Sequence, residues 1–262
     1  MASSRTNADD YLSVVVPVYN ESENVLPLVG EVRAALSGLT GFELVFVDDG
    51  SEDGTSGILA AAISPELRVI RHRKRCGQST ALLTGVRAAR SEWVVTLDGD
   101  GQNDPVDIPS LLAARDQAGE GLLLVSGRRR KRHDSWIKRF SSRVANSVRS
   151  RVLGDDTSDT GCGLKLFRRD AFLELPYFDH MHRFLPALFQ RNGGRVLSVD
   201  VSHRQRRHGR SKYGVHDRLW VGTVDLLGVM WLKARIHHPT VEEVGRNSTR
   251  SKRLEPSEDQ KK

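Results

Sequence analysis

Short apolar runs alternate with helix-length segments through the first half of the chain. The runs are rich in Val, Leu and Ile, which is typical of strands that are buried on both faces of a parallel sheet. The predicted strands are Leu12–Val18, Phe42–Asp49, Leu67–His72, Glu92–Asp98 and Gly121–Gly127. Segments between them, such as ENVLPLVGEVRAAL and GQSTALLTGVRAAR, have helical periodicity. The alternation predicts an α/β fold with a doubly wound, mainly parallel sheet.

The second half of the chain is less regular. A basic segment, GRRRKRHDSWIKRF, is followed by an apolar and aromatic stretch, KLFRRDAFLELPYFDHMHRFLPALFQ. The run Arg195–His203 predicts one more strand, and a second basic cluster, RQRRHGRSKYG, follows it. The predicted organisation is a disordered N-terminus over residues 1–10, one α/β domain over 11–214, an amphipathic helix over 215–240 and a disordered tail over 246–262.

The composition indicates which cellular compartment and which kind of partner to expect. The 262 residues include 40 Lys and Arg against 33 Asp and Glu, a formal charge of +7 and a pI of about 9.7, which implies an anionic partner. The two cysteines, Cys76 and Cys162, form no disulfide framework and have no metal-ligand spacing, which favours a reducing compartment. The N-terminus lacks the apolar core of a signal peptide, and no apolar run is as long as a membrane span, so neither is predicted.

Carboxylates gather where two of the predicted strands end. Asp48 and Asp49 end the second strand, and Asp98 and Asp100 follow the fourth on either side of Gly99. Ligands of doubly wound sheets bind beyond the carboxyl ends of the strands. Two acids across a glycine offer hard oxygen donors on one side of a tight turn, which suits Mg²⁺ or Mn²⁺. The alternative, a helix cap, needs one short polar side chain and leaves the second acid unexplained.

Other ligand-binding motifs are excluded. A calcium loop of the EF-hand type needs a glutamate at its twelfth position, where Ala60 and Pro109 stand when the count begins at Asp49 and Asp98. Neither a P-loop nor a glycine-rich dinucleotide fingerprint follows the first strand. A phosphate-bearing ligand would therefore be held through a carboxylate-bound cation.

Five motifs, taken in order, resemble a known family. They are VVVPVYNESENV, VDDGSEDGT, GQSTALLTGVRAARSEWVVTLDGDGQNDP, DTGCGLKLFRRD and RRHGRSKYG. The chain is similar, from about Leu12 to Gly214, to family-2 glycosyltransferases of the GT-A fold, above all to the polyprenyl-phosphate branch that includes dolichol-phosphate mannose synthase. The resemblance implies a GT-A domain over 11–214, a nucleotide-diphospho-sugar donor, Mg²⁺ or Mn²⁺, a polyprenyl-phosphate acceptor and inversion at the anomeric carbon.

The resemblance also implies a role for individual residues. The donor-binding residues are Pro17, Tyr19, Glu21, Asp48, Asp49, Gly99, Arg206 and Lys212. The metal ligands are Asp98, Asp100 and Gln102. Arg128 would hold the acceptor phosphate, and the candidates for a second acceptor residue are Arg139, Ser142 and Arg143. Asp159 would orient a sugar hydroxyl, which makes Asp98, Asp100, Arg128 and Asp159 the predicted catalytic set.

A phosphate monoester acceptor sets the chemical problem. It is largely ionised at neutral pH, because its second pKa is about 6, so it needs no strong general base. Two anions must instead be brought together while a nucleoside diphosphate leaves, so electrostatic stabilisation should dominate. The predicted cation would act as a Lewis acid on the leaving group.

The basic segments and the C-terminal helix suggest a membrane surface. The segment LWVGTVDLLGVMWL has two tryptophans, an internal acid and basic flanks, Arg218, Lys233 and Arg235, which suits a helix lying in a lipid interface. A buried core helix is the alternative. We expect a peripheral protein at the cytoplasmic face of a membrane, whose lipid-linked product serves a separate membrane-embedded glycosyltransferase in envelope glycan modification, such as that of lipopolysaccharide.

Other functions are disfavoured or left open. A nucleic-acid-binding protein is disfavoured because no RNP, KH or zinc-finger signature is present. A sugar nucleotidyltransferase is disfavoured because PVYNESEN occupies the place of its glycine-rich loop. A soluble or polysaccharide acceptor stays open, as does the sugar, which the resemblance leaves as UDP- or GDP-linked mannose, glucose, aminoarabinose or galacturonate. The surplus of arginine, with His133, His182 and His208, favours an acidic sugar.

Overall fold

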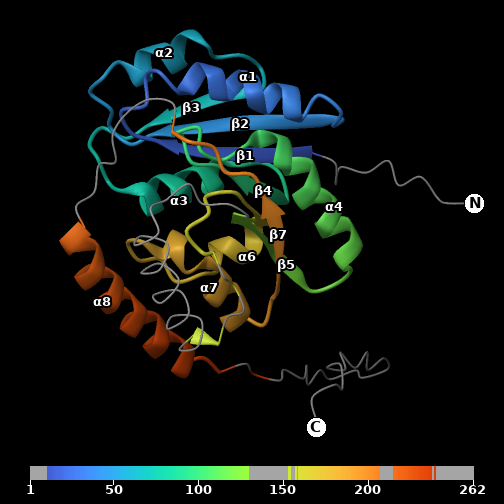
Figure 1. Ribbon diagram of the computed structural model, residues 1–262, viewed down its shortest axis with the longest axis vertical. Helices are drawn as coiled ribbons and strands as arrows, with labels where there is room; N and C mark the ends of the chain where they lie inside the picture. The colour runs from blue at the N-terminus through green and yellow to red at the C-terminus, as the bar shows by residue number, and fades with distance from the viewer. Residues whose placement is uncertain are drawn as a thin grey trace, which may run out of the picture.

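The computed structural model describes residues 11–129, 153, 154, 157, 159–206, 215–237 and 239 (Figure 1). The strands are β1 (Tyr11–Val18), β2 (Gly41–Asp48), β3 (Leu67–Arg71), β4 (Trp93–Thr96), β5 (Leu122–Arg129), β6 (Lys165–Arg168) and β7 (Arg195–Val201). The helices of the first half are α1 (Val25–Ala35), α2 (Thr55–Ala61), α3 (Gln78–Ala88), η2 (Pro105–Asp107) and α4 (Ile108–Ala118). Those of the second half are α6 (Arg169–Leu173), η3 (Met181–Arg183), α7 (Leu185–Arg191) and α8 (Val215–Ala234).

The described strands form one sheet in the order β3-β2-β1-β4-β6-β5-β7. Strands β3, β2, β1 and β4 are parallel to one another, so the doubly wound, mainly parallel sheet is confirmed. The prediction was incomplete in the second half, where β6 lies antiparallel between β4 and β5. Strand β6 is short and nearly buried on both faces, so it carries no alternation that separates it from the apolar stretch around it.

Helices cover both faces of the sheet and create two cores. Alternate residues of β1 point to opposite faces, as the pleat requires. Val14 and Val16 pack with buried residues of α1, α2 and α4, whereas Val15 packs with α3 and with the α6 and α7 region. Figure 1 shows α1 and α2 on one side of β1–β3 and α3 on the other. Because helices bury both faces of the sheet, its strands are continuous apolar runs in the sequence.

The parallel register brings the two acidic strand ends together. Val18 of β1 lies beside Asp48 of β2, and the Asp49 amide donates to the Val18 carbonyl at 2.9 Å. On the other side of β1, the Leu97 amide donates to the Val15 carbonyl as the chain leaves β4. The predicted donor-binding acids Asp48 and Asp49 and the predicted metal ligand Asp98 therefore lie at or just after strand ends at the same edge of the sheet.

Helix α8 packs on the molecule by one face only. Val229 is fully buried, Arg191 Nε of α7 donates to the Leu232 carbonyl, and His180 Nδ1 lies 3.2 Å from an Asp225 oxygen. Large apolar side chains on the opposite face are exposed, namely Val224, Leu227, Met230 and Trp231. The helix is therefore neither a fully buried core helix nor a free one. No helix in the described part of the chain combines the length and the apolar character that crossing a bilayer requires.

Several predictions fall on residues outside those that the structure describes. They are the disordered segments 1–10 and 246–262 and the residues Arg139, Ser142, Arg143, Lys212, His133 and His208. The side chains of Arg218 and Trp220, at the start of α8, are also outside the description.

Candidate active site

The loop after β4 holds the carboxylates of two of the three predicted metal ligands, Asp98 and Asp100, in fixed positions. The Asp98 amide donates to Asn103 Oδ1 at 3.1 Å, and Gln78 Nε2, at the start of α3, donates to Asp98 Oδ1 at 2.9 Å. Asp100 Oδ1 accepts the Gln102 amide at 3.1 Å. A side chain at Gly99 would lie 2.5 Å from Val18 Cγ1, so only glycine lets this loop cross the end of β1. Carboxylates from both sides of Gly99 thereby belong to one tight turn.

Asp98 lies in a charged and poorly hydrated environment. Its pKa is raised to about 6, first because its surroundings remove the carboxylate from water and second because Asp100 repels its charge. Lys165 and Arg129 oppose this shift of the pKa. Burial lowers the pKa of Lys165, while Asp98 is among the anions that raise it. The two carboxylates supply the hard oxygen donors that suit a divalent ion.

Mn²⁺ affinity should therefore depend on pH. A metal ligand must be deprotonated, and Asp98 takes up its proton as the pH falls through about 6 rather than near 3.8. Below about pH 6 the affinity should fall roughly tenfold per pH unit, and above it the affinity should be nearly flat. Titration of the protein with Mn²⁺, followed by electron paramagnetic resonance, measures this. An affinity that stays constant down to about pH 5 would contradict the assignment.

Arg206 reaches the same turn from far along the chain. Its Nη2 lies 2.5 Å from Asp100 Oδ2, and Glu21 and Asp98 add to the negative field around the guanidinium. The segment that precedes Arg206 runs beside the metal loop, because the Arg204 amide donates to the Gln102 carbonyl and the Arg204 guanidinium pairs with Asp104. Arg206, a predicted donor-binding residue, therefore lies at the candidate cation site.

Five of the predicted donor-binding residues lie at or just after the ends of β1 and β2, namely Pro17, Tyr19, Glu21, Asp48 and Asp49. Pro17 is half-buried as the second-last residue of β1, and the guanidinium of Arg75 covers the Tyr19 ring at 4.4 Å from its centroid. The Glu21 amide donates to Thr55 Oγ1, and Glu21 Oε2 accepts from Asn24 Nδ2 at 2.6 Å. These contacts fix the PVYNESEN loop over the sheet edge.

Asp48 and Asp49 already have partners within the protein. Asp48 Oδ1 accepts the Ser51 amide at 2.9 Å, and its other oxygen lies 3.7 Å from Arg71 Nε. The Asp49 carboxylate accepts the amides of Cys76 and Gly77, both at 2.8 Å. Both acids therefore order the loops of the sheet edge, which is a structural role in addition to any contact with a donor.

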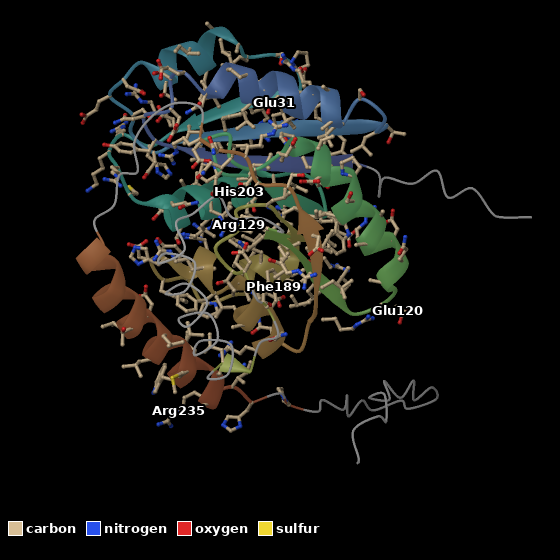
Figure 2. All side chains as sticks on the ribbon, viewed as in Figure 1. Glu31, Glu120, Arg129, Phe189, His203 and Arg235 are labelled. Carbon is tan, nitrogen blue, oxygen red and sulfur yellow. The ribbon has the colours of Figure 1, made fainter. Side chains whose placement is uncertain are left out.

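The two arginines that end β5 lie on opposite faces of the strand. Arg128, which was predicted to hold the acceptor phosphate, is half-exposed and pairs with Asp200 on β7 at 2.6 Å. Arg129 is mostly buried and makes a two-pronged contact with Asp159, at 2.7 Å for each nitrogen (Figure 2). Arg129 also influences Asp98, so it belongs to the candidate site, and Asp159 is held by an arginine rather than standing open.

Sequence reasoning missed two residues of this candidate site, Lys165 and Arg129. Lys165 Nζ donates to the carbonyls of Thr160 and Cys162, which lie in the DTGCG turn. His182, in contrast, was predicted to favour an acidic sugar. Its Nδ1 lies 2.8 Å from Ser79 Oγ, and burial lowers its pKa well below 6.5, which disfavours the cationic form that this role needs. A lysine inside the predicted apolar stretch was the one available signal for Lys165. Nothing in the local pattern separates Arg129 from the basic residues around it.

Relatives with curated functions cover most of the chain. Dodecaprenyl-phosphate galacturonate synthase of Rhizobium johnstonii is 36% identical over 236 residues, 87% of this chain and 69% of that protein. Undecaprenyl-phosphate 4-deoxy-4-formamido-L-arabinose transferase of Pseudomonas fluorescens is 38% identical over 208 residues, 78% of this chain. The chain spans 60% of the length of that transferase, and so matches less than two thirds of it.

Solved structures agree in fold at low identity. Glucosyl-3-phosphoglycerate synthase from Mycobacterium tuberculosis, crystallised with Mn²⁺, UDP-glucose and glycerol 3-phosphate, has a TM-score of 0.66 at 20% identity, with 88% of this chain and 82% of that one covered. Mannosyl-3-phosphoglycerate synthase from Rubrobacter xylanophilus has a TM-score of 0.67 at 17% identity, covering 90% and 78%. The Glycosyl transferase family 2 model matches residues 13–175, and the chain belongs to that family, as a glycosyltransferase of the GT-A fold.

Proposed function

We propose that the protein transfers a sugar, with inversion, from a nucleotide diphosphate to a polyprenyl phosphate. The observation that carries the proposal is the pair Asp98 and Asp100 in one turn, met by Arg206 from the loop after β7. Two carboxylates can bind a cation and an arginine can bind phosphate groups, so the site suits a ligand that contains phosphate and binds together with a cation. The curated relatives, which act on dodecaprenyl or undecaprenyl phosphate, support the same acceptor.

The chain's own residues would divide the work at the donor end. Asp98 and Asp100, with Gln102, would hold Mg²⁺ or Mn²⁺, which when bound supplies Lewis-acid chemistry for the leaving diphosphate. The Arg206 guanidinium now pairs with Asp100, so it neutralises part of the negative charge that would bind a cation. A cation bound there would release Arg206 from Asp100, and its guanidinium would then neutralise the diphosphate. We propose the same role for Lys212, which lies outside the described residues.

The acceptor end is proposed to lie at the end of β5. The Arg128 side chain is half-exposed at that strand end, and its present partner is Asp200, whose side chain is 33% exposed. A phosphate that takes the place of Asp200 would gain a charge-assisted contact without desolvating a buried ion. Arg139, Ser142 and Arg143 remain proposals for the second acceptor contact.

The two arginines should respond differently to substitution. Losing a charge-assisted bond costs about 1.5–3 kcal/mol, so Arg128→Ala should weaken use of the lipid phosphate roughly tenfold to a hundredfold and leave donor affinity intact. Arg129→Ala should instead lower turnover and melting temperature together, because it strands the buried Asp159 carboxylate. Steady-state kinetics in both substrates, with donor binding by calorimetry, distinguishes them. Arg195→Ala, at the opposite end of the neighbouring β7, is the control.

Loss of donor binding in Arg128→Ala would contradict the acceptor role. The acceptor site would then have to be moved to the other face of β5, where Arg129 lies.

A donor screen tests the proposed function as a whole. Purified protein is incubated with Mg²⁺ or Mn²⁺, undecaprenyl phosphate and one radiolabelled UDP- or GDP-sugar at a time. We expect label to enter the organic phase with one donor, and expect an acidic hexuronate or an aminoarabinose derivative to be the best, in line with the relatives. Transfer of label to a soluble acceptor, with none to the lipid, would contradict the lipid-phosphate proposal and favour a soluble or polysaccharide acceptor.

Helix α8 is proposed to rest on the membrane that contains the acceptor. Its outward face carries Val224, Leu227, Met230 and Trp231, and Arg235 lies over the Trp231 ring at 6.0 Å from its centroid. An apolar face with an interfacial tryptophan and a basic end is typical of a helix lying in the headgroup region. Peripheral attachment at the cytoplasmic face, and hand-over to a membrane-embedded transferase, follow as parts of the same proposal.

Acidic substitutions on the exposed apolar face of α8 should weaken binding of the protein to lipid vesicles. Burial of a large apolar side chain is worth roughly 1.5–3 kcal/mol, so Leu227→Glu with Trp231→Glu should weaken binding to phosphatidylglycerol vesicles at least about a hundredfold. Co-sedimentation measures the affinity. Ile63→Glu changes an equally exposed apolar residue in the loop after α2 and should leave vesicle binding unchanged. Equal binding by the α8 variant and the control would count against the membrane role of α8.

A further inference from the structure

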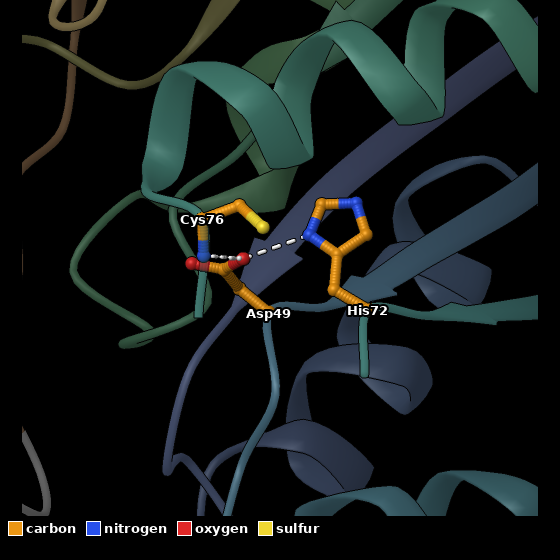
Figure 3. Close-up of side chains that lie close together, drawn as sticks. All are labelled: Asp49, His72 and Cys76. Carbon is orange, nitrogen blue, oxygen red and sulfur yellow. Dashed lines mark hydrogen bonds and ion pairs between the residues drawn. The ribbon is translucent and has the colours of Figure 1, made fainter. Parts of the chain in front are cut away.

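We infer that Asp49, His72 and Cys76 form a binding site for a borderline divalent cation such as Zn²⁺, separate from the Asp98–Asp100 turn. Each residue offers one ligand atom, and the three atoms lie within 4.8 Å of one another (Figure 3). Asp49 directly follows β2, His72 follows β3, and Cys76 lies just before α3, so the cluster is formed by the fold rather than by a sequence motif.

The donor set distinguishes this cluster from the proposed Mg²⁺ or Mn²⁺ site. An imidazole nitrogen, a thiolate and a carboxylate oxygen are the ligands of Zn²⁺, whereas Asp98 and Asp100 offer oxygen alone. Three protein ligands leave the fourth tetrahedral position for water or another small ligand. The cluster therefore selects a different metal from the one that the glycosyltransferase site would hold.

Neighbouring groups hold two of the ligands in position. The amides of Cys76 and Gly77 donate to Asp49, and His72 Nδ1 lies 2.8 Å from Asp49 Oδ1. The turn before Cys76 is pressed against Gly50, since a side chain there would lie 2.8 Å from the Arg75 nitrogen. The exposed Cys76 thiol donates to the Lys74 carbonyl at 3.3 Å, and it would leave this carbonyl to bind a metal.

Thr84 permits the exchange of a proton for a metal at His72. Its hydroxyl lies 2.9 Å from His72 Nε2 and can either donate to that nitrogen or accept from it. Without metal, Nδ1–H donates to Asp49 and Nε2 accepts from Thr84. With metal, Nδ1 is the ligand, Nε2–H donates to Thr84, and the Cys76 thiol releases its proton to water. No oxidant or other reactant is required.

Cobalt binding tests the site on the full chain, after treatment with chelator and reductant. Co²⁺ should give the intense near-ultraviolet band of a cobalt–thiolate bond, and one equivalent of Zn²⁺ should remove it while Mg²⁺ does not. Cys76→Ser should abolish the band, and Thr84→Val should weaken Co²⁺ affinity roughly tenfold to a hundredfold. Asp100→Asn should leave the band unchanged, which separates this site from the proposed glycosyltransferase metal site.

Two outcomes would overturn the site. The first is no thiolate band in the native chain at saturating Co²⁺. The second is a band of equal strength in Cys76→Ser, which would assign it to Cys162, the other cysteine. Cys76 is exposed, so a melting curve like that of the native chain is expected for its serine variant, and loss of the band would not reflect unfolding.

If the proposed function is right, metal binding at this cluster should also weaken binding of the nucleotide-sugar donor. Because Asp49 is also a proposed donor-binding residue, Zn²⁺ should raise the KM for the nucleotide sugar in the native chain and not in Cys76→Ser. Cobalt binding without any change of that KM would support the site and overturn its competition with the donor. A failed donor screen would leave the spectroscopic test unaffected, so the two proposals fail separately.

Discussion

Asp100→Asn is expected to lower sugar transfer at least roughly a thousandfold, since a metal that stabilises leaving-group charge is worth several kcal/mol. The amide keeps the shape of the side chain and can still accept the Gln102 amide, but it loses the charge that binds a cation. Mn²⁺ affinity should fall in parallel, while the melting temperature stays near that of the native chain. Initial rates with lipid phosphate and the chosen donor, at several Mn²⁺ concentrations, measure the effect.

Asp104→Asn is the matched control. Asp104 stands in the same loop, accepts the Val106 amide and pairs with Arg204, and asparagine is an equally good cap. This variant should keep most of the activity and lose a little stability. If Asp100→Asn turned over normally in the presence of EDTA, the metal role of this turn would be wrong.

Gly163→Ala is expected to be nearly as damaging, although it removes no functional group. The added Cβ would lie 2.2 Å from Asp98 Oδ2 and 2.6 Å from Oδ1, so something must move. Asp98 cannot retreat easily, because Gln78 holds its Oδ1, and the Gly163 carbonyl accepts from Thr96 Oγ1 at 2.8 Å. Displacement of a catalytic group by about 1 Å can cost about a hundredfold in rate, and we expect a loss of at least that size.

Gly30→Ala controls for the change from glycine to alanine. Gly30 lies in α1 and a Cβ there meets nothing within 4 Å, so this variant should keep full activity and gain slightly in stability. Rates and Mn²⁺ affinities of the two variants are compared side by side. Full activity of Gly163→Ala would show that Asp98 is free to move, and the fixed geometry of the turn would have to be abandoned.

Arg206 connects the cation site to the loop after β7. It pairs with Asp100 across a sequence separation of more than a hundred residues, and Arg204 pairs with Asp104 and Glu31 beside it. A cation and a guanidinium repel each other, so filling the cation site weakens the hold on Arg206. The same contact that stabilises the negative turn in the absence of a cation would thereby free the loop when a cation is bound.

The sequence by itself determined the architecture of the first half and the identity of the acidic turn. Strands buried on both faces are continuous apolar runs, so β1, β2, β3 and β4 are visible in the sequence, and parallel pairing sends their acidic ends to one edge. Two carboxylates on either side of a glycine are likewise a local pattern, and because fold stability rarely requires it, the pattern indicates a binding site. The five ordered motifs pointed to the family to which the chain belongs.

Only the tertiary structure decided which basic residues lie at the candidate site. Arg128 and Arg129 are adjacent in the sequence, and the strand pleat alone sends one to Asp200 and the other to Asp159. Lys165 reaches the site because β6 inserts antiparallel beside β4, a pairing that its short, doubly covered run does not reveal. Charged side chains act through distance and burial, and both are set by contacts between segments far apart in the chain, so no local pattern of residues could assign them.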